Sequence, residues 1–236
     1  MRIALIHALR HSPPPIEAAF KRLWPQAQTF NLLDDSLASH LVVAQAAEPH
    51  ASIHPALLNR FLTLGRYAAS TGADGILFTC SAFGPYIEAV QEDLKPMPVL
   101  KPNEAIIHDL LALRQGSEAL PVALVATFAP TLESMQVEIA EITKGYADPP
   151  LDILPVHATG ALDALNHGDG DAHDAFVLSA VEKALAARSD IKIVALAQFS
   201  LERSQDVILR RFPHLTVLST PTSAVRAIQQ RLASKQ

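Results

Sequence analysis

The hydrophobic residues of this chain gather in short runs that alternate with longer amphipathic stretches. The runs are rich in Ile, Val and Leu, and helix-length stretches such as 55–71 and 175–188 lie between them. Buried strands of parallel sheets have this composition, because helices cover both faces of such sheets. The pattern therefore predicts an α/β fold, with strands at residues 3–7, 29–33, 75–79, 97–100, 122–126, 151–156, 192–196 and 216–218.

The second half of the pattern repeats the first at a shift of 118 or 119 residues. A spacing that several segments keep in the same order indicates a duplicated structural unit. We predict two pseudo-symmetric, Rossmann-like halves, each a four-stranded parallel sheet flanked by helices. The first comprises residues 1–103 with a C-terminal helix in 221–236, and the second comprises 104–220. The matching segments are 3–6 with 122–125, 76–78 with 194–196, and 99–100 with 217–218.

The ends of the strands are where such a fold carries its chemistry. In open α/β sheets the ligand lies beyond the carboxyl ends of the strands. Two halves that face each other are expected to hold one active site between them. Candidate site residues are therefore those that follow each strand, taken in symmetric pairs.

Cys80 is the only cysteine of the chain, and it follows the third predicted strand. Amide groups at the start of the next helix favour a thiolate, so we expect its pKa to lie below about 8.5. The Ser81 hydroxyl and the amides of Ser81 and Ala82 would suit a carboxylate. A simpler structural interpretation is a thiol packed under the turn, with Ser81 as a helix cap. Both interpretations stay open from the residues alone.

Gln198 stands 118 residues after Cys80, at the same point of the repeat. An amide exchanges hydrogen bonds, but it does not abstract a proton from carbon. Nearby, the hydroxyls of Ser200, Thr127 and Thr131 form either an anion cradle or a set of helix caps. The second half therefore offers hydrogen-bonding groups where the first half offers a thiol.

Other charged residues follow strands as well. Arg10 and His11 precede three prolines that we expect to stiffen a loop over the site, and either side chain could reach in or stay solvated. The carboxylates of Asp34, Asp35 and Glu202 are either partners for a substrate ammonium group or surface charges. We expect the charges of segment 201–204 to form a solvated helix face.

Composition and charge narrow the classes of function. With 49% hydrophobic residues and a net charge of -5, the chain is typical of a globular protein and does not favour nucleic-acid binding. No apolar segment approaches membrane-spanning length, and the apolar start resembles a strand more than a secretory signal, so a cytoplasmic protein is expected. The segment 166–174 holds two His and three Asp, but its spacing is more typical of a solvated turn than of a metal site. No strand precedes a glycine-rich phosphate loop.

The layout resembles the aspartate/glutamate/hydantoin racemase superfamily, which includes maleate isomerase and arylmalonate decarboxylase. The resemblance covers essentially the whole chain and rests on the repeated halves, the turn 79–81, and the strand ends 125–127 and 196–197. It implies a cofactor-independent enzyme that transfers a proton at the carbon α to a carboxylate, acting on a small acid or amino acid. It also implies a homodimer. In this family two cysteines, one from each half, exchange the proton on opposite faces of the substrate.

Carried onto this sequence, the resemblance makes Cys80 the catalytic cysteine and puts Gln198 in place of the second one. A two-face racemase would need another acid–base group, for which His157 is the candidate. Alternatives are a one-base isomerase, decarboxylase or lyase that uses Cys80 alone, and a protein that binds a small acid without converting it. The implied substrate-binding residues are Ser81, Ala82, Thr127, Phe128, Thr131, Phe199 and Ser200.

Overall fold

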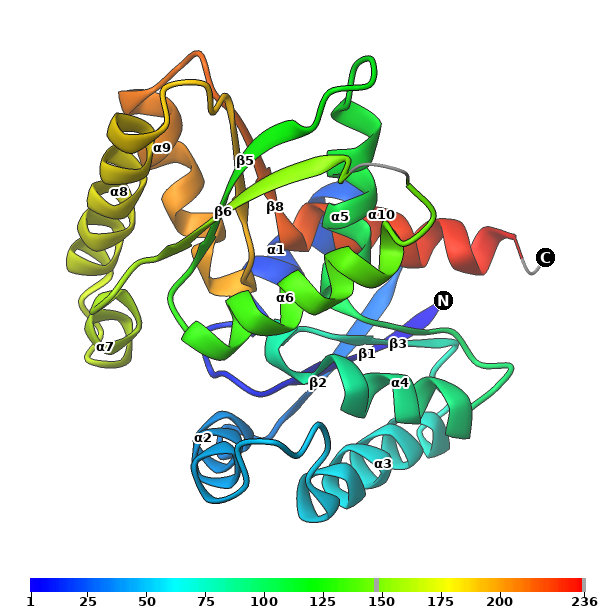
Figure 1. The fold of residues 1–236 in the computed structure, drawn as a ribbon. Helices are drawn as coiled ribbons and strands as arrows, with labels where there is room; N and C mark the ends of the chain where they lie inside the picture. The colour runs from blue at the N-terminus through cyan, green and yellow to red at the C-terminus, as the bar shows by residue number, and fades with distance from the viewer. Residues whose placement is uncertain (147–148, 235–236) are drawn as a thin grey trace. The chain divides into compact units, whose positions relative to one another are not determined.

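A computed structural model describes residues 1–146 and 149–234 of the chain. Backbone contacts divide it into two units, one formed by Met1–Pro102 with the segment from Ala224 onward, the other by Asn103–Ser223. Each unit has a four-stranded parallel sheet flanked by helices, which confirms the predicted fold class (Figure 1). The predicted domain boundaries, after residues 103 and 220, stay a prediction about which parts of the chain fold independently.

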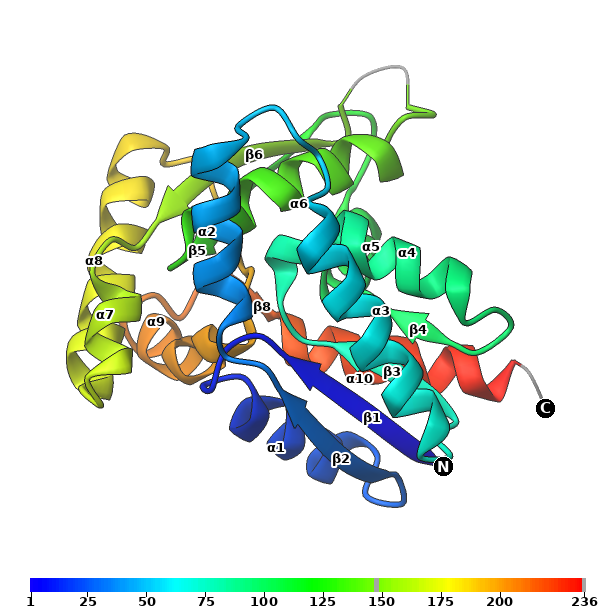
Figure 2. The same ribbon diagram turned by 90° about the horizontal axis from the view of Figure 1, so that it is seen from below.

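The sheet of the first unit has the strand order β2-β1-β3-β4. Figure 2 shows β1 and β2 side by side and running in the same direction. The strands are β1 (Arg2–His7), β2 (Gln28–Leu33), β3 (Gly75–Phe78) and β4 (Val99–Leu100). The helices are α1 (Pro13–Leu23), α2 (Leu37–Ala47), α3 (Pro55–Ser70), the 3₁₀ helix η1 (Ser81–Phe83), α4 (Gly84–Asp93) and α10 (Thr220–Ala233), most of which belongs to this unit.

Helices pack on this sheet because its central strands are apolar on both faces. Every residue from Ile3 to Ile6 in β1 is at most 1% exposed. One face of α1 buries Ile16, Ala19 and Phe20, which follow the three- and four-residue spacing of a helix. From α10, Ile228 and Leu232 reach the backbone of Gly75 in β3. The helices that cover both faces of the sheet thus explain why successive residues of its central strands are apolar.

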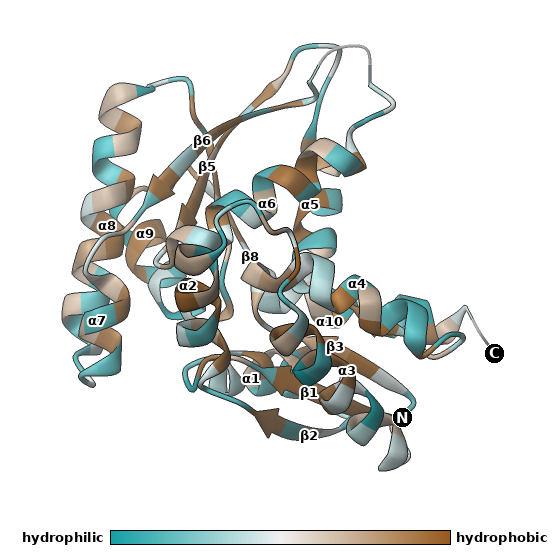
Figure 3. Ribbon diagram, turned by 60° about the horizontal axis from the view of Figure 1, so that its bottom comes forward, coloured by the Kyte–Doolittle hydropathy of each residue, from teal (hydrophilic) through white to brown (hydrophobic). Residues whose placement is uncertain are grey.

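The sheet of the second unit has the equivalent order, β6-β5-β7-β8. Alternate residues of β5 point to opposite faces: Val122 and Leu124 pack with α5 and α6, and Ala123 and Val125 pack with α8. In Figure 3 the strands are mostly brown, whereas the helices alternate between teal and brown. The strands are β5 (Leu120–Ala126), β6 (Leu151–His157), β7 (Ile193–Leu196) and β8 (Thr216–Ser219); the helices are α5 (Pro102–Leu113), α6 (Ala129–Ile142), α7 (Ala161–Asn166), α8 (Gly170–Ala187), the 3₁₀ helix η2 (Phe199–Ser204) and α9 (Gln205–Arg211).

Strand pairing follows the predicted repeat. In the first unit Ile6 of β1 faces Phe78 of β3, and in the second Val125 of β5 faces Leu196 of β7. The strand ends are therefore equivalent in the two units. No helix within the described residues is long and apolar enough to cross a membrane.

Two predicted elements differ in detail. The strand expected at 97–100 is only Val99–Leu100, because Pro98 has no amide hydrogen for the ladder, although its carbonyl accepts from Ile76. The three prolines after His11 do not form a loop, since Pro13–Pro15 make the first turn of α1. Proline is tolerated there because amides of the first turn have no helical acceptor.

Candidate active site

Cys80 and Gln198 occupy equivalent positions, each two residues beyond the end of its strand. Both have an extended backbone, with φ -119° and ψ 120° at Cys80 and φ -138° and ψ 148° at Gln198, and each directly precedes a 3₁₀ helix. Both are buried. The same backbone turn thus presents a thiol in one unit and an amide in the other.

Burial dominates the chemistry of the Cys80 thiol. The side chain is 7% exposed, and removal from water raises its pKa to about 11, although the amide of Ala82 donates a hydrogen bond that favours the thiolate. The predicted lowering of this pKa is therefore wrong. One amide at a short 3₁₀ turn does not replace the water that an ionised sulfur loses. Cys80 is consequently a thiol at neutral pH.

The neighbours of Cys80 in η1 are buried too. Ser81 is 2% exposed and Ala82 is 7% exposed. Ser81 is not the N-cap of this helix, because Cys80 holds that position. In this structure the Ala82 amide, expected to hold a carboxylate, donates to the Cys80 thiol.

A buried histidine, which the sequence did not single out, hydrogen-bonds to the residue before the thiol. The Nδ1 atom of His7 lies 2.7 Å from Thr79 Oγ1, and its Nε2 atom lies 2.8 Å from Asn31 Oδ1. Asn31 donates through Nδ2 to Glu17 at 2.5 Å, so its Oδ1 is an acceptor and His7 Nε2 carries the hydrogen. Nδ1 then accepts from the Thr79 hydroxyl. Burial lowers the pKa of His7, against the raising effects of Asn31 and Glu17, so the ring is neutral.

The network between His7, Thr79 and Asn31 belongs to the unit that carries the Cys80 thiol and has no equivalent at the matching strand end of the second unit. Thr79 directly precedes Cys80, so the network fixes the strand end that carries the sulfur. The positions equivalent to His7 and Thr79 in the second unit are Ala126 and Ala197. A usable signal was present in the sequence, because a histidine ends an otherwise apolar strand where its repeat has alanine.

In the second unit, Thr127 fixes the side chain of Gln198. The Thr127 amide and hydroxyl both donate to Gln198 Oε1, at 2.5 and 3.0 Å. A backbone N–H can only donate, so the atom that it meets must be the amide oxygen. The Nε2 atom is therefore directed away from Thr127, and it is buried with no hydrogen-bond partner among residues 1–146 and 149–234. A buried donor without an acceptor lowers the stability of the folded protein by about 1–3 kcal/mol.

Two hydroxyls close to this pair in the sequence are also buried without a hydrogen-bond partner among the described residues. Thr131 Oγ1 and Ser200 Oγ are buried and have no partner within the described part of the chain. Neither hydroxyl caps its helix, since the N-cap of α6 is Phe128 and that of η2 is Gln198. We call Gln198 Nε2, Thr131 Oγ1 and Ser200 Oγ the donor cluster. Of the remaining predicted binding residues, Phe199 is buried and Phe128 is half-buried.

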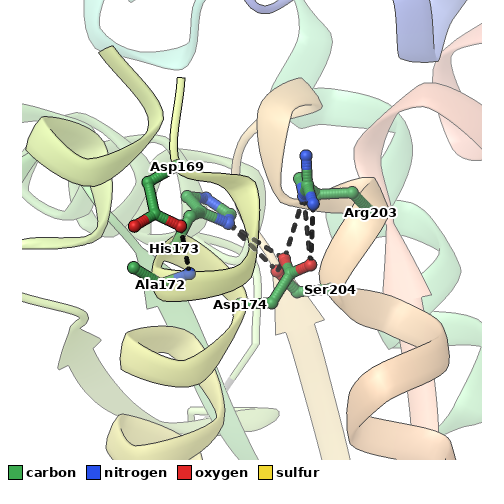
Figure 4. Close-up of polar contacts among 6 residues, drawn as sticks. All are labelled: Asp169, Ala172, His173, Asp174, Arg203 and Ser204. Atoms are coloured by element: carbon green, nitrogen blue, oxygen red, sulfur yellow. Dashed lines mark hydrogen bonds and ion pairs between the residues drawn. The ribbon is translucent and has the colours of Figure 1, made fainter. Parts of the chain in front are cut away.

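The segment that carries Gln198 and Ser200 is tied to α8 by a polar group (Figure 4). Ser204 donates to Asp174 at 2.6 Å, Arg203 donates to it at 3.0 Å, and His173 Nδ1 lies 3.0 Å from it. Burial alone would raise the pKa of Asp174, but the hydrogen bonds from Arg203, Ser204 and His173 hold it below its ordinary value. Of the two charges expected on a solvated face over 201–204, Arg203 is exposed while it donates to Asp174, and Glu202 is half-buried.

The segment 166–174 contributes helix structure. Asp169 caps α8 by accepting from the Ala172 amide at 2.9 Å, as Figure 4 shows. Among the residues that the structure describes, no three His, Cys, Asp or Glu side chains come together in a way that could hold a metal ion.

The charged residues that follow β1 and β2 form ion pairs within the first unit. Arg10 pairs with Asp35, and Arg60 of α3 pairs with Asp34. In the second unit Glu202 accepts from Ser219 Oγ at 2.8 Å. All three carboxylates considered for a substrate ammonium group therefore already accept from a neighbouring side chain.

His157, considered as a replacement base, ends β6 beside Ala126. Its ring is exposed, and its Nδ1 atom lies 3.3 Å from Thr159 Oγ1. Exposure in an edge strand is an ordinary environment for histidine, and nothing in these contacts prepares it as a base.

The sequence matches the Asp/Glu/hydantoin racemase family over residues 15–228. The chain belongs to this family. Solved structures of racemases share the fold of this family member. An allantoin racemase from Klebsiella pneumoniae superposes with a TM-score of 0.72 at 19% identity, covering 100% of this chain and 89% of that one.

Two further racemases extend the likeness. Glutamate racemase from Francisella tularensis subsp. tularensis SCHU S4, in complex with D-glutamate, has a TM-score of 0.71 at 14% identity and covers 99% and 81% of the two chains. Aspartate racemase from Picrophilus torridus has a TM-score of 0.65 at 12% identity and covers 98% and 94%. No curated protein matches the sequence. At these identities the structures show a common fold, and family membership supports an isomerase.

Proposed function

We propose that this chain is a cofactor-independent enzyme that transfers a proton at the carbon α to a carboxylate of a small acid, with Cys80 as its acid–base group. One observation carries this proposal: equivalent buried turns of the two units present Cys80 in one and Gln198 in the other. The chain thus supplies one proton-transfer group and one hydrogen-bonding group. Family membership supports the reaction class.

Proton removal at such a carbon needs help, because the Cα–H group is a very weak acid. Hydrogen bonds to the carboxylate stabilise the negative charge that develops there. The donor cluster offers such bonds from Gln198, Thr131 and Ser200. We propose the wider substrate-binding set to be Ser81, Ala82, Thr127, Phe128, Thr131, Phe199 and Ser200.

A second candidate function is favoured by the raised pKa of Cys80. A resting thiol is prepared to give a proton rather than to take one. If the substrate carries two carboxylates on one carbon, loss of carbon dioxide leaves the bonding electron pair on that carbon, and the Cys80 S–H group protonates it. Water then returns a proton to the thiolate. Such a one-base decarboxylase needs no acid–base group at Gln198.

Proton NMR in deuterated water tests both candidates. The panel holds aspartate, glutamate, hydantoins, maleate and arylmalonates, and each is incubated with wild type and Cys80→Ala. Deuterium at the α carbon without loss of carbon dioxide, abolished in Cys80→Ala, is the result expected from the first candidate. Conversion of a malonate to a product deuterated on one face favours the second. An acid that binds but neither exchanges nor converts would contradict both and favour a small-acid-binding protein.

A further inference from the structure

We propose that Gln198 binds a carboxylate of the substrate through its side-chain amide, and that this chain therefore works on one face of the substrate only. The binding role rests on contacts within the second unit. The stereochemical consequence rests on the proposed function.

The orientation of the Gln198 amide is the first step. Its oxygen accepts from both the amide and the hydroxyl of Thr127. A flipped side chain would put the NH₂ group against the Thr127 N–H, two donors facing each other. Thr127 therefore locks the rotamer, and both Nε2 hydrogens are offered elsewhere. Gln198 is only 4% exposed, so water does not satisfy them freely.

The donor cluster has hydrogens to give and no protein group among the described residues that takes them. Nε2 offers two hydrogens, and the hydroxyls of Thr131 and Ser200 offer one each, all without a partner in the described residues. No member of the cluster is charged. A carboxylate accepts several hydrogen bonds and donates none, whereas an ammonium group only donates. The hydroxyls can also accept, but Gln198 Nε2 only donates, so this group suits a carboxylate and disfavours an amine.

The proton can move on one face of the substrate only. To act as a base, Cys80 first loses its proton to solvent; the minor thiolate form then takes the α proton onto sulfur, and the electron pair of the C–H bond is delocalised into the carboxylate that the donors hold. The Gln198 amide has no proton to give to carbon and no basic site to accept one. The proton thus returns from Cys80 to the face that it left. Exchange with solvent is expected to proceed with retention of configuration.

The binding role is tested on the full-length protein labelled with nitrogen-15. The Gln198 NH₂ signal is assigned by its loss in Gln198→Met, and propionate, propionamide and propylamine are titrated in turn. Propionate is expected to shift this signal saturably, with a much smaller effect from the amide and none from the amine. Gln198→Met should weaken propionate binding about tenfold or more. Wild-type affinity in that variant, or an unmoved signal at saturation, would overturn the role.

Two controls separate binding from folding. Gln205 donates through Nε2 to the Val217 carbonyl, so Gln205→Met removes an amide that already has a protein acceptor. Its affinity for propionate should equal that of wild type. Thr127→Val removes one of the two bonds that lock Gln198 and should weaken binding, whereas Thr127→Ser should restore it. Equal affinities for Thr127→Val and Thr127→Ser would contradict the lock.

The stereochemical role is tested with Gln198→Cys. In deuterated water the wild type should exchange the α proton of an enantiopure acid with retention, and Gln198→Cys should gain racemisation. Racemisation by wild type would overturn one-face chemistry. Absence of exchange in every acid would refute the proposed function, while the NMR titration would still decide whether Gln198 binds a carboxylate.

Discussion

The Thr79 hydroxyl donates to Nδ1 of His7 across 2.7 Å, one residue before the Cys80 thiol. The two units share strand order and register, yet the second has Ala126 and Ala197 at these positions. A polar network buried in one copy of a repeat and absent from the other is not required by the fold. It follows the residue that differs between the copies, so we interpret it as support for the strand end that carries Cys80.

Replacing His7 by leucine is expected to destabilise the protein. The change takes the short hydrogen bond from the buried Thr79 hydroxyl and leaves it only the Ile6 carbonyl, 3.3 Å away, whereas the exposed Asn31 can turn to water. A weakened buried hydrogen bond of this kind lowers the free energy of unfolding by about 1 kcal/mol or more. Urea unfolding followed by circular dichroism measures the loss. His108 of α5 is exposed, so His108→Leu should change the free energy of unfolding by less than about 0.5 kcal/mol. Equal effects of the two substitutions would show that the His7 network contributes nothing.

The effect of His7→Leu should also depend on pH. Because burial lowers the pKa of His7, the unfolded chain binds a proton below about pH 6.5 while the folded chain does not. Wild type therefore loses stability from this group as pH falls from 6.5 toward the folded pKa, and the leucine variant does not. The difference in unfolding free energy between them should shrink from pH 7.5 to pH 5. A constant or growing difference would mean that His7 is charged in the folded state.

Alkylation of Cys80 reports its raised pKa directly. With a pKa of about 11, roughly one thiol in three thousand is ionised at pH 7.5, and only the thiolate reacts. The rate of modification by iodoacetamide, followed by mass spectrometry, should rise about tenfold for each pH unit between pH 7 and 10. Reaction in urea should be fast at pH 8.5, where an exposed cysteine ionises. A plateau near pH 8.5 in the folded protein would refute the raised pKa.

The periodicity of the chain was sufficient to predict the parallel sheets, because strands buried on both faces must be apolar at every position, as β1 is from Ile3 to Ile6. The repeat then made Cys80 and Gln198 equivalent. The pKa of Cys80 could not be predicted from the sequence, since it depends on how far folding removes the thiol from water. The donor cluster was equally hidden: Thr131 and Ser200 have the sequence of helix caps, and only the fold shows that they cap nothing.

Asp174 is predicted to matter far more than an exposed aspartate. It accepts from Ser204 and Arg203 with its side chain 13% exposed, and hydrogen bonds to a charged group contribute about 1.5–3 kcal/mol. Asp174→Ala should therefore lower the free energy of unfolding by about 2 kcal/mol or more. Asp190 pairs with Arg188 at the surface with its side chain 51% exposed, so Asp190→Ala should cost less than about 1 kcal/mol. Chemical denaturation of both variants gives the comparison, and similar losses would contradict an anchoring role for Asp174.

Gly65 sets the spacing between α3 and α4, the helix that follows the Cys80 turn. A Cβ atom added at Gly65 would overlap Val90 Cγ1 of α4, and Val90 is fully buried. We therefore expect Gly65→Ala to push α4 away from α3, and overpacking of this kind costs about 1–3 kcal/mol. The displacement acts at the helix that η1 leads into, so the alkylation rate of Cys80 should change as well.

Gly145 is the matched control, because a Cβ atom there meets nothing within 4 Å among residues 1–146 and 149–234, and its backbone is not left-handed. Gly145→Ala should leave both the unfolding free energy and the Cys80 alkylation rate unchanged. If Gly65→Ala is as stable as Gly145→Ala, α3 and α4 are free to separate without cost. If it is destabilised while Cys80 reacts as in wild type, the position of α4 does not govern access to the thiol, and burial of Cys80 is set by the strand end and the His7 network instead.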